Sequence, residues 1–189
     1  MASLILGIDP GSRATGYAIL QDNSGKLRAV QCDTIRLAHL DDHSDRLQLL
    51  FEEITGIIAR VKPQSAAVET PVYGQDPMAM LKLGRAQAAC LLAITNSGLS
   101  VTEYYPKEIK KSITGNGNAS KEQVAHMLHR MITIPQKKLT KDATDALAIA
   151  WCHWMKAKNP APANTQRHKN NQKSGWKSFV ENNPDRISS

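Results

Sequence analysis

Three short apolar runs, with no room for a helix between them, open this chain of 189 residues. They are SLILGI at 3–8, TGYAIL at 15–20 and LRAVQCDTI at 27–35. The segments that separate them, DPGS and DNSGK, contain the Pro, Gly and Asn residues that favour turns. Because apolar strands joined by short turns pair antiparallel, we expect a three-stranded meander before any helix.

Apolar residues then recur every three and four positions, which is the spacing of a helix with one buried face. Leu47, Leu50 and Ile54 begin this series, and Lys62-Pro63 ends it. Elements of both kinds follow in alternation. They are a strand at 65–70, a helix at 78–96, a strand at 101–105, and helices at 120–131 and 141–155. The segment TGNGN at 114–118 is too rich in glycine and asparagine for regular structure.

This order predicts an α/β protein whose mixed five-stranded sheet has helices on both faces. The strands at 65–70 and 101–105 each follow a helical crossover. Such crossovers are right-handed and join parallel strands, so we expect both strands to run parallel to the first.

The composition favours one soluble domain with a tail. A hydrophobic fraction of 41% is enough for one core, and no apolar run in the sequence approaches the roughly 18 residues that span a bilayer. No secretory signal is recognisable, so we expect a cytoplasmic protein with no membrane partner. The segment NPAPANTQRHKNNQKSG has no aliphatic residue larger than alanine or proline. We therefore expect a folded domain over 1–156 and a basic, disordered tail over 157–189.

Carboxylates stand at the ends of two predicted strands. Asp9 follows LILGI and Glu69 follows SAAV, so each would lie at the carboxyl end of a buried strand. If the first and fourth strands are parallel neighbours, these two ends meet. Asp142 and Asp145 lie one turn apart in the last predicted helix and share a face. The sequence therefore predicts four acids, from three elements, around one point.

Such a cluster needs a cation, because packed carboxylates repel and raise one another's pKa. Oxygen ligands without His or Cys favour Mg²⁺ or Mn²⁺ over zinc. Two such ions, roughly 3.5 to 4 Å apart, would activate a water on one side of a phosphodiester and stabilise the leaving oxygen on the other. The predicted chemistry is hydrolysis of a phosphodiester with two Mg²⁺ ions, for which Mn²⁺ can substitute.

Each acid taken alone also has a structural interpretation. Asp142 and Asp145 could stabilise a helix N-terminus through the macrodipole. Asp9 could form the turn before Pro-Gly. Glu69 is harder to explain in this way, because a charged residue that continues a buried strand is poorly placed without a partner.

Basic residues are concentrated in two segments. Residues 105–141 hold eight Lys and Arg against two acids, and residues 157–189 hold six against two, whereas the rest of the chain is slightly acidic. This distribution indicates a polyanion partner, although a basic segment can also be a solvated face. Four lysines flank the Gly/Asn loop, where they could neutralise DNA phosphates: Lys107, Lys110, Lys111 and Lys121.

Four motifs of the chain resemble the RuvC family of Holliday junction resolvases. They are LGIDPGSRATGYAI at 6–19, AVETPVYGQDPMAMLKLGRAQA at 67–88, EYYPKEIKKSITGNGNASKEQV at 103–124 and KDATDALAIA at 141–150. They occur in the family's order with similar spacing, and the resemblance covers residues 4–154. It implies an RNase H-like fold and a crossover junction endodeoxyribonuclease.

The resemblance also implies residue roles. The family's acidic tetrad, which binds two divalent ions, matches Asp9, Glu69, Asp142 and Asp145. Lys110 and Lys121 match basic positions that contact the scissile region. The family usually places a base-stacking phenylalanine after the glutamate, whereas this chain has Val72 and Tyr73, of which Tyr73 could still stack. Arg13 and Arg85 complete the expected DNA contacts.

The partners that the resemblance implies are four-way junction DNA, a second copy of the chain, and the RuvA and RuvB branch-migration proteins. Family members act as homodimers that nick two strands symmetrically. The predicted helix from Met78 resembles the segment through which the subunits meet. The tail beyond about residue 157 has no counterpart in the short members of the family, and its charge could add non-specific affinity for DNA.

Three alternatives remain at this point. GIDPGS also resembles the phosphate-binding hairpin of actin-like and sugar-kinase ATPases, but one domain cannot supply their second lobe and adenosine pocket. A ribosomal-RNA processing nuclease of the same fold is closer, although the segment at 114–124 fits the resolvase better. A junction-binding module without catalysis is the third, and the four acids speak against it.

Overall fold

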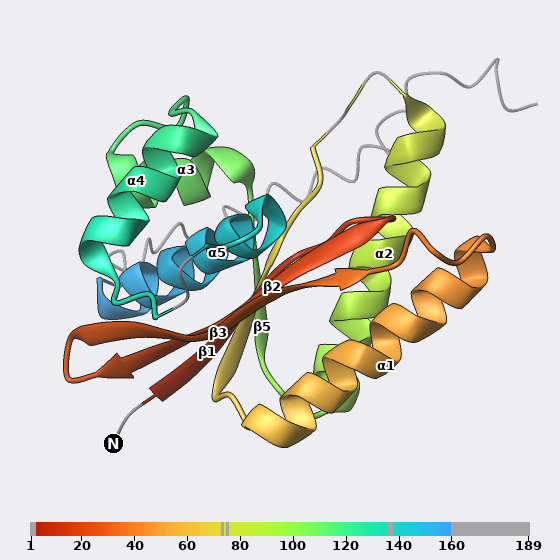
Figure 1. Ribbon diagram of the computed structural model, residues 1–189, viewed down its shortest axis with the longest axis horizontal. Helices are drawn as coiled ribbons and strands as arrows, with labels where there is room; N and C mark the ends of the chain where they lie inside the picture. The colour runs from red at the N-terminus through yellow and green to blue at the C-terminus, as the bar shows by residue number, and fades with distance from the viewer. Residues whose placement is uncertain (1–2, 73, 75, 136–137, 160–189) are drawn as a thin grey trace, which may run out of the picture. The chain divides into compact units, whose positions relative to one another are not determined.

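The computed structural model describes residues 3–72, 74, 76–135 and 138–159, which form a single compact unit (Figure 1). The elements in chain order are β1 (Ser3–Asp9), β2 (Ala14–Asn23), β3 (Lys26–Arg36), α1 (His43–Val61), β4 (Ser65–Glu69), α2 (Pro77–Asn96), β5 (Val101–Tyr104), α3 (Pro106–Thr114), α4 (Lys121–Met131) and α5 (Lys141–Lys158). The alternation that the sequence predicts is therefore present.

The five strands form one mixed sheet in the order β3-β2-β1-β4-β5. Strands β1, β2 and β3 pair antiparallel, as expected of a meander. Strand β4 pairs parallel to β1, and β5 pairs parallel to β4. The prediction that both crossover strands run parallel to the first is confirmed, as expected of strands joined by the helical crossovers α1 and α2.

Helices cover both faces of the sheet (Figure 1). Helices α1 and α2 pack on one face, where Leu6, Leu50 and Ile94 belong to one apolar core. Helix α5 covers the other face, with α3 and α4 outside it, and there Ile5 and Leu147 belong to a second core. Consecutive residues Ile5 and Leu6 serve opposite cores because side chains alternate along a strand.

Helix α3 is absent from the expected elements. Its nine residues include three lysines and only two buried apolar side chains, Ile109 and Ile113, which is too short a series to show helical periodicity. Its start and end do have sequence signals. Pro106 is the first helical residue, and Gly115 ends the helix in the left-handed conformation with φ 76°.

Helix α5 is longer than the sequence predicts. Residues 157 and 158, expected to begin the disordered tail, instead belong to its last turn. The Nζ of Lys158 lies 3.2 Å from Oδ2 of Asp22, which is buried on β2, and Trp154 donates to the same oxygen at 3.0 Å. These contacts tie the end of the helix to the β2–β3 hairpin. The rest of the predicted tail, 160–189, lies outside the described residues.

Helix α2 is more apolar than expected from the sequence analysis, in which no apolar run approached the length that spans a bilayer. Within the described residues it is the one helix whose length and composition would suffice to cross a bilayer. Its inner face, with Ala86 and Cys90, belongs to a core shared with α1 and the sheet. Its outer face exposes Met78, Leu81 and Leu92. The apolar composition therefore comes from one face packed on the sheet and a second apolar face left uncovered.

Candidate active site

Asp9 and Glu69 end neighbouring parallel strands. Asp9 is the last residue of β1 and Glu69 the last of β4, and Ile8 pairs with Val68 immediately before them. The two carboxylates therefore emerge side by side at the carboxyl edge of the sheet. This is the neighbourhood that the sequence predicts for them.

Two glycines bring α5 against the same part of the sheet. A Cβ on Gly16 would lie 2.0 Å from the backbone oxygen of Asp142, and a Cβ on Gly7 would lie 2.2 Å from that of Ala146. No side chain fits in these gaps, so the helix backbone contacts the strand backbone. Because Gly16 pairs with Asp9 in the β1–β2 ladder, this contact sets the first turn of α5 beside Asp9.

Burial and mutual repulsion raise the pKa values of the two strand carboxylates. Burial is the largest cause for Asp9, followed by the charges of Glu69 and Asp145, and together they raise its pKa to about 7. Burial and then the charge of Asp145 raise the pKa of Glu69 to about 7. Lys121 acts in the opposite direction on both. Carboxylates held in this way need a cation in order to ionise fully at neutral pH.

The acids face a shared cavity of about 170 Å³. The polar side chains that line it are Asp9, Glu69, Asp145, Lys110 and Lys121. Asp142 is not among its lining residues, although its charge contributes the smallest of the effects that raise the pKa of Asp9. The structure thus gathers three of the predicted acids around one cavity, while the fourth, Asp142, does not line it.

The donors fit hard divalent ions. All four are carboxylates, with oxygen ligands of the kind that Mg²⁺ and Mn²⁺ prefer. Among the described residues, no three His, Cys, Asp or Glu side chains stand in a ready-made metal-binding arrangement. In this arrangement, Nζ of Lys121 forms an ion pair with Oδ2 of Asp145. A metal at this point requires that lysine to move.

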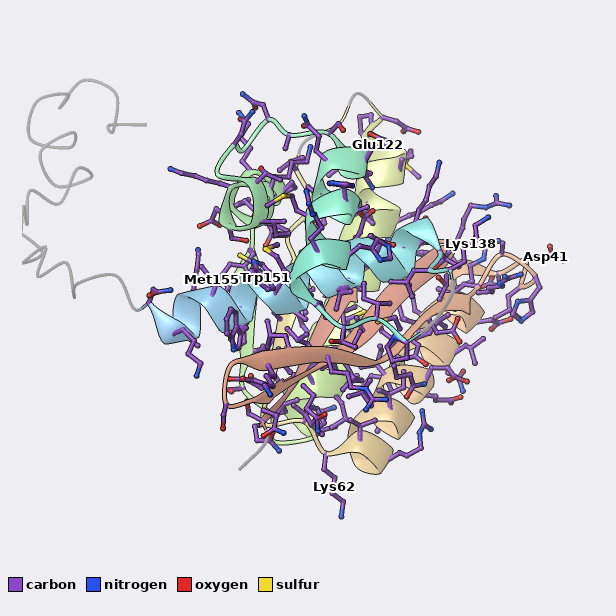
Figure 2. The ribbon with its side chains drawn as sticks, turned by 60° about the vertical axis from the view of Figure 1, so that its left-hand side comes forward. Asp41, Lys62, Glu122, Lys138, Trp151 and Met155 are labelled. Atoms are coloured by element: carbon purple, nitrogen blue, oxygen red, sulfur yellow. The ribbon has the colours of Figure 1, made fainter. Side chains whose placement is uncertain are left out.

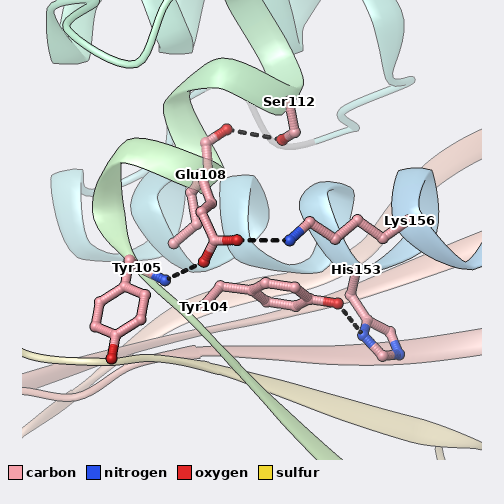
Figure 3. A network of polar contacts seen from close by, with 7 residues as sticks. Tyr104, Tyr105, Glu108, Ser112, His153 and Lys156 are labelled. Carbon is pink, nitrogen blue, oxygen red and sulfur yellow. Dashed lines mark hydrogen bonds and ion pairs between the residues drawn. The ribbon is translucent and has the colours of Figure 1, made fainter. Parts of the chain in front are cut away.

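Helix α3, which supplies Lys110 to the cavity, is anchored to α5 by a polar network (Figure 3). Glu108 accepts from Nζ of Lys156 at 2.8 Å and from the backbone N–H of Tyr105 at 3.0 Å. The Lys156 ammonium also lies 4.6 Å from the ring centroid of Tyr104. Tyr104 in turn hydrogen-bonds His153 at 3.0 Å.

Sequence reasoning did not single out these anchoring residues, because their partners lie 48 and 49 positions apart in the chain. Glu108 at the third helical position supplies only half of a capping box, because Tyr105 at the N-cap makes no side-chain cap hydrogen bond. A second anchor joins Trp151, on the C-terminal half of α5 (Figure 2), to the Ser112 carbonyl at 3.4 Å.

The other predicted DNA contacts are distributed around this site. Lys107 and Lys111 are exposed on α3. Arg13, between β1 and β2, and Arg85, on α2, are also exposed. Val72 is 54% exposed three residues after Glu69. Tyr73 lies outside the described residues. Of the predicted DNA contacts that the structure describes, Lys110 and Lys121 line the acidic cavity, and the others do not.

Comparisons with known proteins identify one family. The family model described as crossover junction endodeoxyribonuclease RuvC matches residues 5–153. The RuvC of Salinibacter ruber is 48% identical over 186 residues, covering 98% of this chain and 99% of that protein. The RuvC of Porphyromonas gingivalis is 41% identical and covers 97% of this chain and 96% of its own length.

A solved structure has the same fold. Thermus thermophilus RuvC, in complex with a Holliday junction substrate, is similar with a TM-score of 0.76 and 26% identity, covering 82% of this chain and 95% of the other. The alignment with the Salinibacter protein extends beyond the matched domain, so the C-terminal segment has a counterpart there. The strand-end acids, the helix that closes on them and these matches together show that the chain belongs to the RuvC family of crossover junction endodeoxyribonucleases.

Proposed function

We propose that this protein resolves Holliday junctions as a structure-specific endonuclease, by symmetric hydrolysis of phosphodiester bonds with two metal ions. The observation that carries this proposal is the cavity in which Asp9, Glu69 and Asp145 face Lys110 and Lys121. Carboxylates for metal beside lysines for phosphate are the two kinds of group that phosphodiester hydrolysis requires. Membership of the RuvC family and the fold shared with a junction-bound relative support the choice of substrate.

The residues that would hold two Mg²⁺ ions are Asp9, Glu69, Asp142 and Asp145. When bound, the ions supply a Lewis acid for the attacking water and for the leaving oxygen, and Mn²⁺ could replace Mg²⁺. The protein's own part is to fix the carboxylates. The paired strand ends hold Asp9 beside Glu69, and the close approach at Gly16 holds α5 against them.

Lysines and arginines around the cavity would hold the DNA backbone. Lys110 and Lys121 line the cavity itself and would neutralise the phosphate at the scissile bond. Lys107, Lys111, Arg13 and Arg85 are exposed and would contact phosphates farther along the junction arms. Val72 and Tyr73 follow the catalytic edge of the sheet and would contact unpaired or stacked bases at the crossover.

Symmetric cleavage of two strands calls for two active sites, and the uncovered face of α2 offers a surface through which two copies can pair. Met78, Leu81 and Leu92 are 61%, 47% and 56% exposed there. Leu81 and Leu92 lie three turns apart, so they share one stripe of the helix. We propose a homodimer through this face, cooperation with RuvA and RuvB, and action in the cytoplasm. The basic segment 160–189, which follows the last helix of the nuclease domain, would add non-specific DNA affinity.

The test is cleavage of a mobile synthetic four-way junction beside a linear duplex and an RNA–DNA hybrid, with Mg²⁺ present or removed by EDTA. We expect paired, symmetric, Mg²⁺-dependent nicks in the junction alone. Asp9→Asn should abolish cleavage and leave junction binding intact. Tight binding without nicks under any divalent ion would favour a non-catalytic junction binder, and preference for the hybrid would favour RNA processing.

A further inference from the structure

Lys121 closes the acidic cluster as an internal cation. It is the first residue of α4, whose start is fixed by a capping box between Ser120 and Gln123. From there its ammonium reaches α5 and pairs with Oδ2 of Asp145. The two side chains differ in exposure: that of Lys121 is 66% exposed and that of Asp145 is 17% exposed. A mostly solvated lysine thus neutralises a mostly buried acid.

No other basic side chain in the described part of the chain forms an ion pair with any of the four acids. Lys110 lines the same cavity without such a contact, although its charge also favours ionisation of Glu69. The charge of Lys121 favours ionisation of both Asp9 and Glu69. Before metal binds, the ammonium of Lys121 therefore neutralises part of the negative charge that a divalent ion would neutralise.

An ammonium and a dication cannot occupy the same carboxylate pocket without strong repulsion, because the low dielectric of a partly buried site screens them poorly. Lysine is also suited to leave. Its charge lies at the end of a flexible four-carbon stem, and here most of the side chain is already in water. Because the lysine leaves into water, breaking this pair costs less than breaking one in which both partners are buried. Exchange is therefore within reach of metal binding.

We propose that Lys121 is the counter-ion of the metal site before metal binds, and that a divalent ion binds by displacing it from Asp145. The inference rests on the proposed two-metal function and deepens it. Displacement does two things at once: it opens an oxygen of Asp145, and it frees the ammonium for the phosphate of the scissile bond. The lysine thus becomes available to substrate only when the site is loaded, and it holds down the affinity of the site for metal in the absence of DNA.

The experiment measures metal affinity without DNA or cleavage. Thermal unfolding midpoints of the full chain are recorded against MgCl2 concentration, with NaCl added to keep the ionic strength constant, because an ion that binds only the folded state raises the midpoint with its concentration. Lys121→Met keeps the stem and removes the charge. We expect its midpoint without metal to fall and its half-saturating Mg²⁺ concentration to drop by about three- to tenfold. Lys121→Gln should behave in the same way.

Lys110→Met is the matched control, because Lys110 lines the same cavity but pairs with none of the acids. Its Mg²⁺ response should change by less than about twofold, as expected for a more distant charge. Unchanged or weaker Mg²⁺ affinity in Lys121→Met would overturn the exchange, as would an equal gain in Lys110→Met. In either case the wild-type protein would still respond to Mg²⁺ and Asp9→Asn would still abolish that response. The proposed two-metal function would then stand without the exchange. A wild-type protein that does not respond to Mg²⁺ at all would contradict the proposed function, and the exchange with it.

Discussion

Gly16 lies directly against the backbone of Asp142, so closely that a Cβ on the glycine would be 2.0 Å from the aspartate's carbonyl oxygen. The same glycine pairs with Asp9 across the β1–β2 ladder. The smallest side chain in the protein therefore sets the distance between the strand that supplies one acid and the helix that supplies two others.

Gly16→Ala should move α5 away from the sheet. The added methyl meets backbone atoms, which cannot rotate away as a side chain would, so we expect destabilisation of about 1–3 kcal/mol or more. Junction cleavage should fall further than stability alone predicts, because Asp142 and Asp145 move relative to Asp9. Urea unfolding and junction cleavage at a temperature where the variant remains folded measure the two effects.

Gly56→Ala is the matched control for this change. Gly56 lies within α1, and a Cβ there would meet nothing within 4 Å. Alanine is favoured over glycine inside a helix by about 1 kcal/mol, so this variant should be slightly more stable and fully active. Equal activity in both alanine variants would show that the close approach of α5 is not needed for catalysis.

The meeting of Asp9 and Glu69 could be predicted from the sequence because it follows from strand order and direction. Two apolar runs ending in acids, separated by a helical crossover, leave few topologies. The ion pair between Lys121 and Asp145 could not be predicted. It depends on the loop between α3 and α4 and on the rotation of α5, neither of which has a periodic signal.

The same limit applies to Asp142 and to α3. One turn of spacing predicts that Asp142 and Asp145 share a helix face, but only Asp145 lines the cavity, because small rotations decide which carboxylate reaches it. Helix α3 could not be predicted from apolar periodicity, because three of its nine residues are lysines. Its burial rests on Ile109 and Ile113 alone, and the contacts of Glu108 and Trp151 that anchor it come from distant parts of the chain.

The raised pKa values of Asp9 and Glu69 predict an unusual pH dependence of the metal-free protein. Both pKa values are about 7 in the folded state, against 3.8 and 4.5 for the unperturbed groups. Between these values the folded state binds more protons than the unfolded state, so stability falls as pH rises from about 4 to about 7 and levels off above that. We expect a loss on the order of 6 kcal/mol, about 3 kcal/mol from each group, measured by urea unfolding in EDTA.

Asp9→Asn removes one of the two groups and should flatten this profile, with a metal-free protein more stable than wild type at pH 7.5. Asp41→Asn, at an exposed position before α1, should follow the wild-type curve. Saturating Mg²⁺ should also flatten the wild-type profile, because bound cations favour the ionised carboxylates. A wild-type stability that rises between pH 5 and 7 in EDTA would show that these acids are not held in the buried, repulsive cluster.

Leu92→Glu tests the proposed dimer. Leu92 is 56% exposed on the outer face of α2, so a charge there should leave the fold intact while it disrupts a second copy packed on that face. Light scattering at micromolar concentration should give a monomer, and junctions should receive single nicks in place of paired ones. Val30→Glu, at a site on β3 that is 50% exposed, should remain dimeric and cut both strands. A dimeric Leu92→Glu protein would place the subunit interface elsewhere.

Removal of residues 160–189 tests the basic tail while it keeps all of α5, including the contact of Lys158 with Asp22. The segment 157–189 holds six basic residues and two acids, and all but one of these charges lie beyond Asn159. Each phosphate contact that is lost reduces the salt dependence of binding by about one unit of slope, so junction affinity should weaken and become less sensitive to NaCl. Cleavage at low salt and the unfolding midpoint should stay close to those of the full chain. The buried core lies within residues 3–159, so a truncated protein that fails to fold would mean that the tail packs on the nuclease domain. An unchanged salt slope would mean that the tail does not contact DNA.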